Sequence, residues 1–226
     1  MNTIINVLAS PTEAFTSIKA TPRFLAALLL LMAGAGLAQF FYFNGVDIAW
    51  FFEQQLAANP NTTEAQAAQF VRLITRVPQP TVAAVFALIS AIAIACVFLI
   101  LALYFKLVSA ITKDGLGYKQ LFALVCWSSL PGVLSSLAQI VKLVTTDVSL
   151  MPATEINPLA FWTILGLDPI GAGTFDQVVM SMDPTNIWSL VLLILGYKIF
   201  SGKNIGTAAF IALIPTVVIF GLAFAW

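Results

Sequence analysis

The chain has 226 residues, of which 60% are hydrophobic and only 9% are charged, and its mean hydropathy is +0.98. A soluble domain carries about 25% charged residues, so the composition indicates one membrane domain instead. The net charge is zero and histidine is absent. This balance argues against a basic nucleic-acid-binding surface, and it removes the commonest general base and zinc ligand.

The N-terminal residues alternate between apolar and polar side chains. Pro11 favours a helix that begins near it, with Ser10 or Thr12 as the cap. We expect residues 1–23 to form an amphipathic cytosolic segment that lies on the inner face of the membrane. Its apolar side chains are Ile4, Ile5, Val7, Leu8, Phe15 and Ile18.

Five long apolar runs follow, and a bilayer core takes about 20 such residues per helix. They predict an all-α bundle of five transmembrane helices that fills residues 24–226. The first run, up to Ala38 before Gln39, also fits a signal peptide, but apolar residues continue through Phe43 and favour a retained span. The expected spans are residues 24–43, 82–105, 120–141, 184–200 and 205–226.

Two long loops carry local helix patterns. In the first, Asn61 and Glu64 resemble a capping box for a helix over about residues 62–76. In the second, residues 142–183, the apolar stretch 161–165 is too short to span and is expected to be interfacial or re-entrant. Asp183 is expected to cap the fourth span, with a proline at its first helical position.

The basic residues are unevenly divided between the two sides of the membrane. Seven of the ten flank the spans on one side and three on the other. The positive-inside rule therefore predicts a cytoplasmic N-terminus and an external C-terminus. The larger group is Lys19, Arg23, Lys106, Lys113, Lys119, Lys198 and Lys203, and the smaller is Arg72, Arg76 and Lys142.

The second span carries a stripe of small residues. Ala83, Ala87, Ala91 and Ala95 recur at a spacing of four, which places them on one helix face where another helix approaches closely. The stripe is interpreted as a packing face, either within the bundle or between protomers of a homo- or hetero-oligomer.

The third span is the most polar. Pro131 removes a backbone hydrogen bond and is expected to kink the helix. The polar groups around it favour either interhelical hydrogen bonding or a polar pathway, and no Asp, Glu, Arg or His lies within the centre of any run to couple ions. The candidate pathway residues are Gln39 of the first span and Ser128, Ser129, Pro131, Gly132, Ser135 and Gln139 of the third.

Enzyme motifs are absent from the sequence. It contains no H-E-x-x-H, G-x-S-x-G or P-loop pattern. Cys96 and Cys126 both lie inside apolar runs, where thiols act as small apolar groups. We therefore expect no catalytic residue, no metal site and no cofactor.

Three stretches resemble one known family, in the right order along the chain. They are PTEAFTSI at residues 11–18, followed by Pro22; YKQLFALVCWSSLP at 118–131; and DPTNIW at 183–188, leading into Leu195 and Gly196. Together they resemble the Yip domain family of Ypt/Rab-interacting membrane proteins, in its short bacterial branch. The resemblance implies a five-span α-helical protein of the cell inner membrane that usually has no enzymatic activity.

Eukaryotic members of that family resemble trafficking factors that bind Rab-type GTPases and pair with related membrane proteins. Only residues 1–23 precede the first span here, which argues against GTPase binding. The first hypothesis is a non-enzymatic protein that organises membrane partners or lipids through helix packing. The alternative is a small transporter or channel for a neutral solute or lipid, with the kinked third span lining the path.

Overall fold

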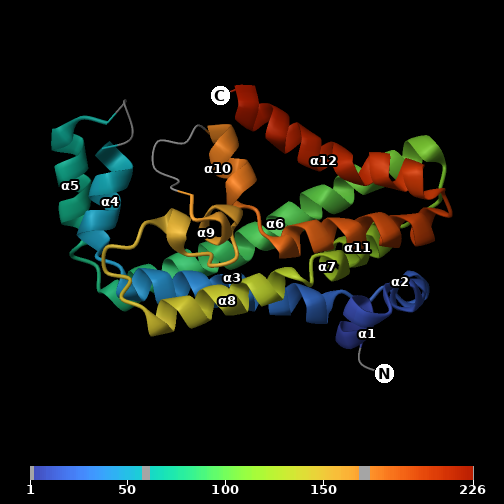
Figure 1. Cartoon of the computed structure of the whole chain (residues 1–226), viewed down its shortest axis with the longest axis horizontal. Coiled ribbons are helices and arrows are strands. Elements are labelled where there is room, and N and C mark those ends of the chain that lie inside the picture. Colours follow the sequence, from blue (N-terminus) through green and yellow to red (C-terminus); the bar gives the residue numbers. More distant parts are fainter. Residues whose placement is uncertain (1–2, 58–61, 168–173, 226) are drawn as a thin grey trace.

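The computed structural model describes residues 3–57, 62–167 and 174–225, and these residues form helices and connecting segments without strands. Figure 1 shows long helices running side by side, with shorter helices at both ends of the bundle. The α-helices are α1 (Thr3–Ala9), α2 (Pro11–Ala20), α3 (Leu25–Gly45), α4 (Ile48–Ala57), α5 (Glu64–Ile74), α6 (Gln79–Thr112), α7 (Tyr118–Ser128), α8 (Gly132–Thr145), α9 (Phe161–Leu165), α10 (Thr174–Ser181), α11 (Pro184–Ser201) and α12 (Ile205–Ala225).

The spanning elements confirm the expected all-α membrane fold. Within the described residues, α3, α6, α11 and α12 are long and apolar enough to cross a bilayer, and α7 with α8 makes a fifth span if the bent pair is counted as one. The second span is longer than expected, because α6 continues through 34 residues to Thr112. At about 1.5 Å per residue it exceeds the roughly 30 Å hydrocarbon core by several turns.

The third span is broken at the proline, as the sequence predicts. The axes of α7 and α8 differ by 42°. Pro131 has no N–H to donate and its ring crowds the carbonyl four residues earlier. The chain crosses the break with tighter bonds, from Gly132 N to Ser129 O at 2.9 Å and from Val133 N to Leu130 O at 3.0 Å.

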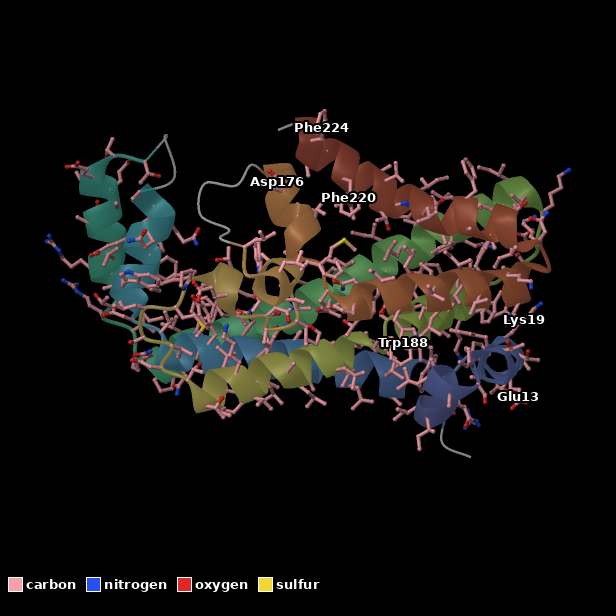
Figure 2. All side chains as sticks on the ribbon, in the orientation of Figure 1. Glu13, Lys19, Asp176, Trp188, Phe220 and Phe224 are labelled. Atoms are coloured by element: carbon pink, nitrogen blue, oxygen red, sulfur yellow. The ribbon has the colours of Figure 1, made fainter. Side chains whose placement is uncertain are left out.

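The N-terminal helices α1 and α2 pack onto the bundle. Phe15 is fully buried, and its ring lies 6.4 Å from that of Phe200 at the end of α11. A Cβ added at Gly196 would come within 3.1 Å of the Phe15 ring, so the glycine provides the space for this contact. Lys19 at the end of α2 donates to Ile199 O at 3.2 Å (Figure 2). The apolar face of α2 therefore contacts protein, where the sequence analysis expected lipid.

At the opposite end, α3 terminates against the start of α6. The Gln79 amide donates to Phe43 O at 3.2 Å and to Val46 O at 2.8 Å, and so satisfies carbonyls that a helix end leaves open. The Phe43 ring stacks on Phe86, with centroids 4.0 Å apart. This end of the bundle is thus held by both hydrogen bonds and ring contacts.

The helix expected over residues 62–76 is present but shorter, as α5. Its capping box is formed by Thr63 and Gln66: Gln66 N donates to Thr63 Oγ1 at 3.3 Å, and Thr63 N donates to Gln66 Oε1 at 3.0 Å. The expected box from Asn61 to Glu64 is therefore displaced by two residues, since Glu64 is already the first helical position. Asn61 itself lies outside the described residues.

The two groups of basic residues lie at opposite ends of the bundle. Lys19 contacts the end of α11, close to Lys203, whereas Lys142 at the other end donates to Glu155 O. This segregation is the arrangement that the alternating loops require. The absolute orientation, with a cytoplasmic N-terminus, stays a prediction.

An ion pair ties two loops together at the lysine-rich end. Lys203 Nζ lies 2.8 Å from Asp114 Oδ1, and the side chains are 22% and 3% exposed, respectively. The hydroxyls of Thr112 and Tyr197 donate to Asp114 Oδ2 at 2.7 and 3.1 Å. Burial raises the pKa of the Asp114 carboxyl, but these hydrogen bonds and the Lys203 charge lower it more, so its pKa lies below the ordinary 3.8.

We expect Asp114→Asn to lower the free energy of unfolding by about 2 kcal/mol at neutral pH, because hydrogen bonds to a charged group are lost. A depressed folded-state pKa stabilises the fold above the ordinary carboxyl pKa and ceases to do so as pH falls through the folded value. The difference in the free energy of unfolding between wild type and variant should thus be constant from pH 7 to about 5, and it should shrink below about pH 4. Thermal unfolding in detergent across this range measures it, and a gap that widens in acid would contradict the assignment.

Candidate binding site inside the bundle

The N-terminus of α11 is capped by Asp183. Its Oδ1 accepts from Thr185 N at 2.8 Å and from Asn186 N at 3.2 Å, and Asp183 N donates back to Asn186 Oδ1 at 2.8 Å. The Thr185 hydroxyl also donates to Oδ1. The predicted cap is confirmed, and it follows from the Asp-Pro sequence, since proline suits the first helical position.

The second oxygen of the same carboxylate joins three segments of the chain. Asp183 Oδ2 accepts from Ser135 Oγ of α8 at 2.6 Å and from Asn157 Nδ2 of the preceding loop at 2.8 Å. Gln139 Nε2 in turn donates to Ser135 Oγ at 3.2 Å. Asp183 is 2% exposed, and its hydrogen-bond partners in the described part of the chain are all uncharged. Neutral donors thus hold a buried negative charge.

This cluster lies deep in the bundle. Ser136, next to Ser135, faces Gly34 so closely that an added Cβ at Gly34 would lie 2.9 Å from the serine Cβ. Gly34 is near the middle of α3, so Asp183 meets α8 at the level of the centre of an apolar span. The sequence analysis placed no acidic residue at this depth.

The depth of Asp183 arises because the loop between α8 and α11 folds back into the bundle. Near its start, Tyr42 Oη at the end of α3 donates to Met151 O at 2.8 Å. Further along, Phe161 N donates to Met182 O at 2.9 Å, closing the loop on itself just before Asp183. Figure 1 shows α9 and α10 beside the long helices, between the α4–α5 pair and α12. The interfacial or re-entrant role of residues 161–165 stays a prediction.

A first cavity of about 450 Å³ adjoins the cluster, and it is called the polar cavity here because half of its described lining residues have amide or hydroxyl side chains. It is lined by Gln39 of α3, Gln139 of α8 and the folded-back loop, including Asn157 and Trp162, with no charged side chain among the described lining residues. Trp162 is 6% exposed, and its Nε1 has no hydrogen-bond partner within the described chain. An unmet buried donor is costly. The nitrogen itself is enclosed by protein atoms, whereas other atoms of Trp162 line the cavity.

A second, largely apolar cavity of about 520 Å³ lies at the bend of the third span. Ser128, Ser129 and Gly132 line it together with apolar side chains of α3, α6, α11 and α12. Ser128 is 2% exposed, and its hydroxyl has no partner among the described residues. Val178 and Ser181 of α10 line both cavities, so the two spaces adjoin at this helix.

The candidate pathway residues of the sequence analysis fall into three places. Gln39 and Gln139 line the polar cavity, and Ser128, Ser129 and Gly132 line the apolar cavity. Ser135 donates a hydrogen bond to Asp183, and Pro131 lies at the helix break.

Sequence analysis missed the contribution of Asn157, Trp162 and Asp183 to this site. Asn157 and Trp162 lie in a long loop that shows no periodic pattern, and Asp183 was assigned only as a cap. The apolar stretch around Trp162 was the one available indication that the loop enters the bundle.

The alanine stripe of α6 packs within the chain. A Cβ added at Gly36 of α3 would lie 3.2 Å from Ala87 O and 3.7 Å from Ala91 Cβ. Ala83 is fully buried, and Ala95 is partly buried farther along the same face. The structure therefore places the stripe against α3, where small residues let the two helices approach closely.

These features define a class: a multi-span helical membrane protein with a polar cluster and two cavities inside its bundle. Residues 5–226 match the Yip1 domain family, and the chain belongs to that family. The match confirms the resemblance to the Yip domain family, whereas the bacterial branch stays a prediction. The family is generally one of non-enzymatic membrane trafficking proteins. No curated protein and no solved structure matches the chain significantly.

We expect Asp183→Asn to destabilise the fold by about 2–4 kcal/mol, because an amide has one acceptor oxygen. That oxygen can keep the helix cap, but the amide NH2 group then faces the donors of Ser135 and Asn157. Thermal unfolding would measure the loss, and limited proteolysis should show earlier cleavage between residues 146 and 183. Asp147→Asn is the matched control, since Asp147 is exposed and bonds only locally to Ser149. Equal stability of the two variants would refute a central role for the Asp183 cluster.

Ala91→Leu should lower the free energy of unfolding by about 1–3 kcal/mol, because added methyl groups overpack the contact with Gly36. Ala93→Leu is the control, since Ala93 points to the opposite side of α6 from Ala91 and is exposed. Thermal unfolding of both variants in the same detergent gives the comparison. If Ala91→Leu unfolds like wild type and only its oligomeric state changes, the stripe serves contacts between protomers instead.

Proposed function

We propose that this chain is a non-enzymatic, Yip-like bacterial inner-membrane protein that organises lipids in the bilayer through the packing of its helices. Its N-terminus is cytoplasmic and its C-terminus external in this proposal. The observation that carries it is the apolar cavity of about 520 Å³ at the centre of the bundle. This volume falls within the roughly 300–1,000 Å³ of ligand pockets.

The position of the cavity favours a lipid over a water-soluble ligand. Ile219 of α12 lines it and is also 57% exposed on the membrane-facing side, so the cavity is reachable from the hydrocarbon. Figure 1 shows α12 diverging from α11 beyond their shared turn. Figure 2 shows Phe220, another lining residue, on the side of α12 that faces this space. An acyl chain matches such a lining.

The position of the alanine stripe favours lipids over a second protein as what this chain organises. Because Ala87 and Ala91 are occupied by Gly36 of the same chain, the stripe is not free to recruit a second protein. Family membership supports the non-enzymatic assignment.

Lipid analysis of the protein purified in native lipid discs tests the proposal. Filling the cavity with Ser189→Leu and Thr216→Leu should reduce a co-purified lipid severalfold, because both residues line the space. Val191→Leu is the control, since Val191 lies on the same helix and is 46% exposed. A lipid profile that equals that of the bulk membrane in wild type and variants alike would overturn the proposal.

The alternative, transport of a neutral solute, is favoured by one observation: the two cavities adjoin at α10, one polar and one apolar. Single cysteines at Ser128, Ser136 and Gln139, in a chain with Cys96 and Cys126 replaced by alanine, would report water access. Labelling by a membrane-impermeant thiol reagent at all three positions would support a path. Uniform protection would exclude one.

A further inference from the structure

We propose that a cavity at the lysine-rich end of the bundle binds the phosphodiester of an anionic glycerophospholipid, whose acyl chain lies along α3. The cavity has a volume of about 590 Å³ and is formed by α7 and by the segment that joins α2 to α3. It is called the basic cavity here, because Arg23 and Lys119 line it. No described residue lines both this cavity and the apolar one, so the inference goes beyond the proposed function and does not depend on it.

The basic cavity holds two positive charges that the protein does not neutralise. Arg23 lies two residues before α3, and Lys119 lies in the first turn of α7. Both side chains are exposed, and neither makes a hydrogen bond or an ion pair within the described chain, where the ion pair is that of Lys203 with Asp114. The described lining residues include no acidic side chain. An anionic group is therefore the ligand chemistry that matches this cavity.

The segment that carries Arg23 is fixed by the protein itself. Trp127 of α7 is 3% exposed, and its Nε1 donates to Arg23 O. Arg23 N donates to Thr21 O at 2.8 Å, and the ring of Phe24 packs edge to face on that of Phe122, with centroids 4.8 Å apart. These contacts use the backbone of Arg23 and leave its guanidinium free. An anion would thus meet a segment that is already ordered, which lowers the entropic cost of binding.

The order of charged and apolar lining residues matches an amphiphile. Arg23 lies just before a membrane span, at the level where lipid headgroups meet a protein. Leu25 and Leu29 follow it one helical turn apart, line the same cavity, and are 61% and 53% exposed. The cavity is therefore basic at the end of α3 and apolar along it, with access to the hydrocarbon. A phospholipid has its phosphate and its acyl chains in this order, whereas a soluble phosphate would leave both leucines uncovered.

Native mass spectrometry of the full-length protein in detergent tests the proposal. Dioleoylphosphatidylglycerol, which is anionic, and dioleoylphosphatidylcholine, which is zwitterionic, are added separately, and the Kd of the first bound lipid is measured for each. The variants are Arg23→Gln and Lys119→Gln, which should fold like wild type because neither side chain has a partner in the described chain. Lys198→Gln is the matched control, since Lys198 is an exposed lysine at the same end of the bundle and does not line the cavity. Glycerophosphoglycerol, the headgroup without acyl chains, serves as a competitor.

Wild type should bind phosphatidylglycerol roughly tenfold more tightly than phosphatidylcholine, because two cations contribute. Each cavity variant should weaken phosphatidylglycerol binding roughly three- to tenfold, the effect of one cation near an anionic lipid. The effect on phosphatidylcholine should be smaller, since its choline offsets the phosphate charge, and Lys198→Gln should change neither.

Equal binding of the two lipids by wild type, or an equal loss in Lys198→Gln, would overturn the proposal. Full displacement of the lipid by an equimolar amount of glycerophosphoglycerol would assign the cavity to a soluble phosphodiester and overturn the lipid assignment. The preference for phosphatidylglycerol should persist when Ser189→Leu and Thr216→Leu fill the apolar cavity. That variant separates a failure of this inference from a failure of the proposed function.

Discussion

The hydrogen bonds of one buried carboxylate govern how this bundle is assembled. Inside a bilayer every polar backbone and side-chain group needs a partner within the protein. Asp183 provides that partner for the start of α11, for Ser135 of α8 and for Asn157 of the folded-back loop. Without it, an irregular segment at the level of the middle of α3 would expose unmet donors. The loop can therefore enter the bundle only because this acceptor is present there.

The two ends of the bundle are fixed by different interactions. At one end Gln79 satisfies the carbonyls that terminate α3, and aromatic rings pack around Phe43. At the other end the Asp114–Lys203 pair joins two loops, and Phe15 of α2 fills the space left by Gly196. Between these ends, Gly36 lets α3 contact α6. The ends are thus held firmly, while the middle, around the bend at Pro131, retains cavities.

The spans were predictable because the features that define them can be read along the sequence alone. Length, apolarity and the exclusion of charge locate α3, α6, α11 and α12, and Pro131 locates the break. The depth of Asp183 was not predictable in this way, because a cap looks the same at the membrane surface and inside a bundle. The amphipathic pattern around Phe15 likewise shows which face is apolar but not that α11 covers it. Within the candidate site, the sequence identified the polar residues of the third span. Their partners in the loop could not be identified, because those contacts depend on tertiary structure.

Two unmet polar groups belong to residues beside the empty spaces. The hydroxyl of Ser128 and the indole N–H of Trp162 are buried without a partner in the described chain, and other atoms of each residue line one of the two adjoining cavities. Both features lower the stability of the unliganded fold. Sequences depart from full packing and full hydrogen bonding chiefly at functional sites. A ligand that fills the space would recover the packing part of this cost. Inside the bundle, such space remains at the bend of the third span.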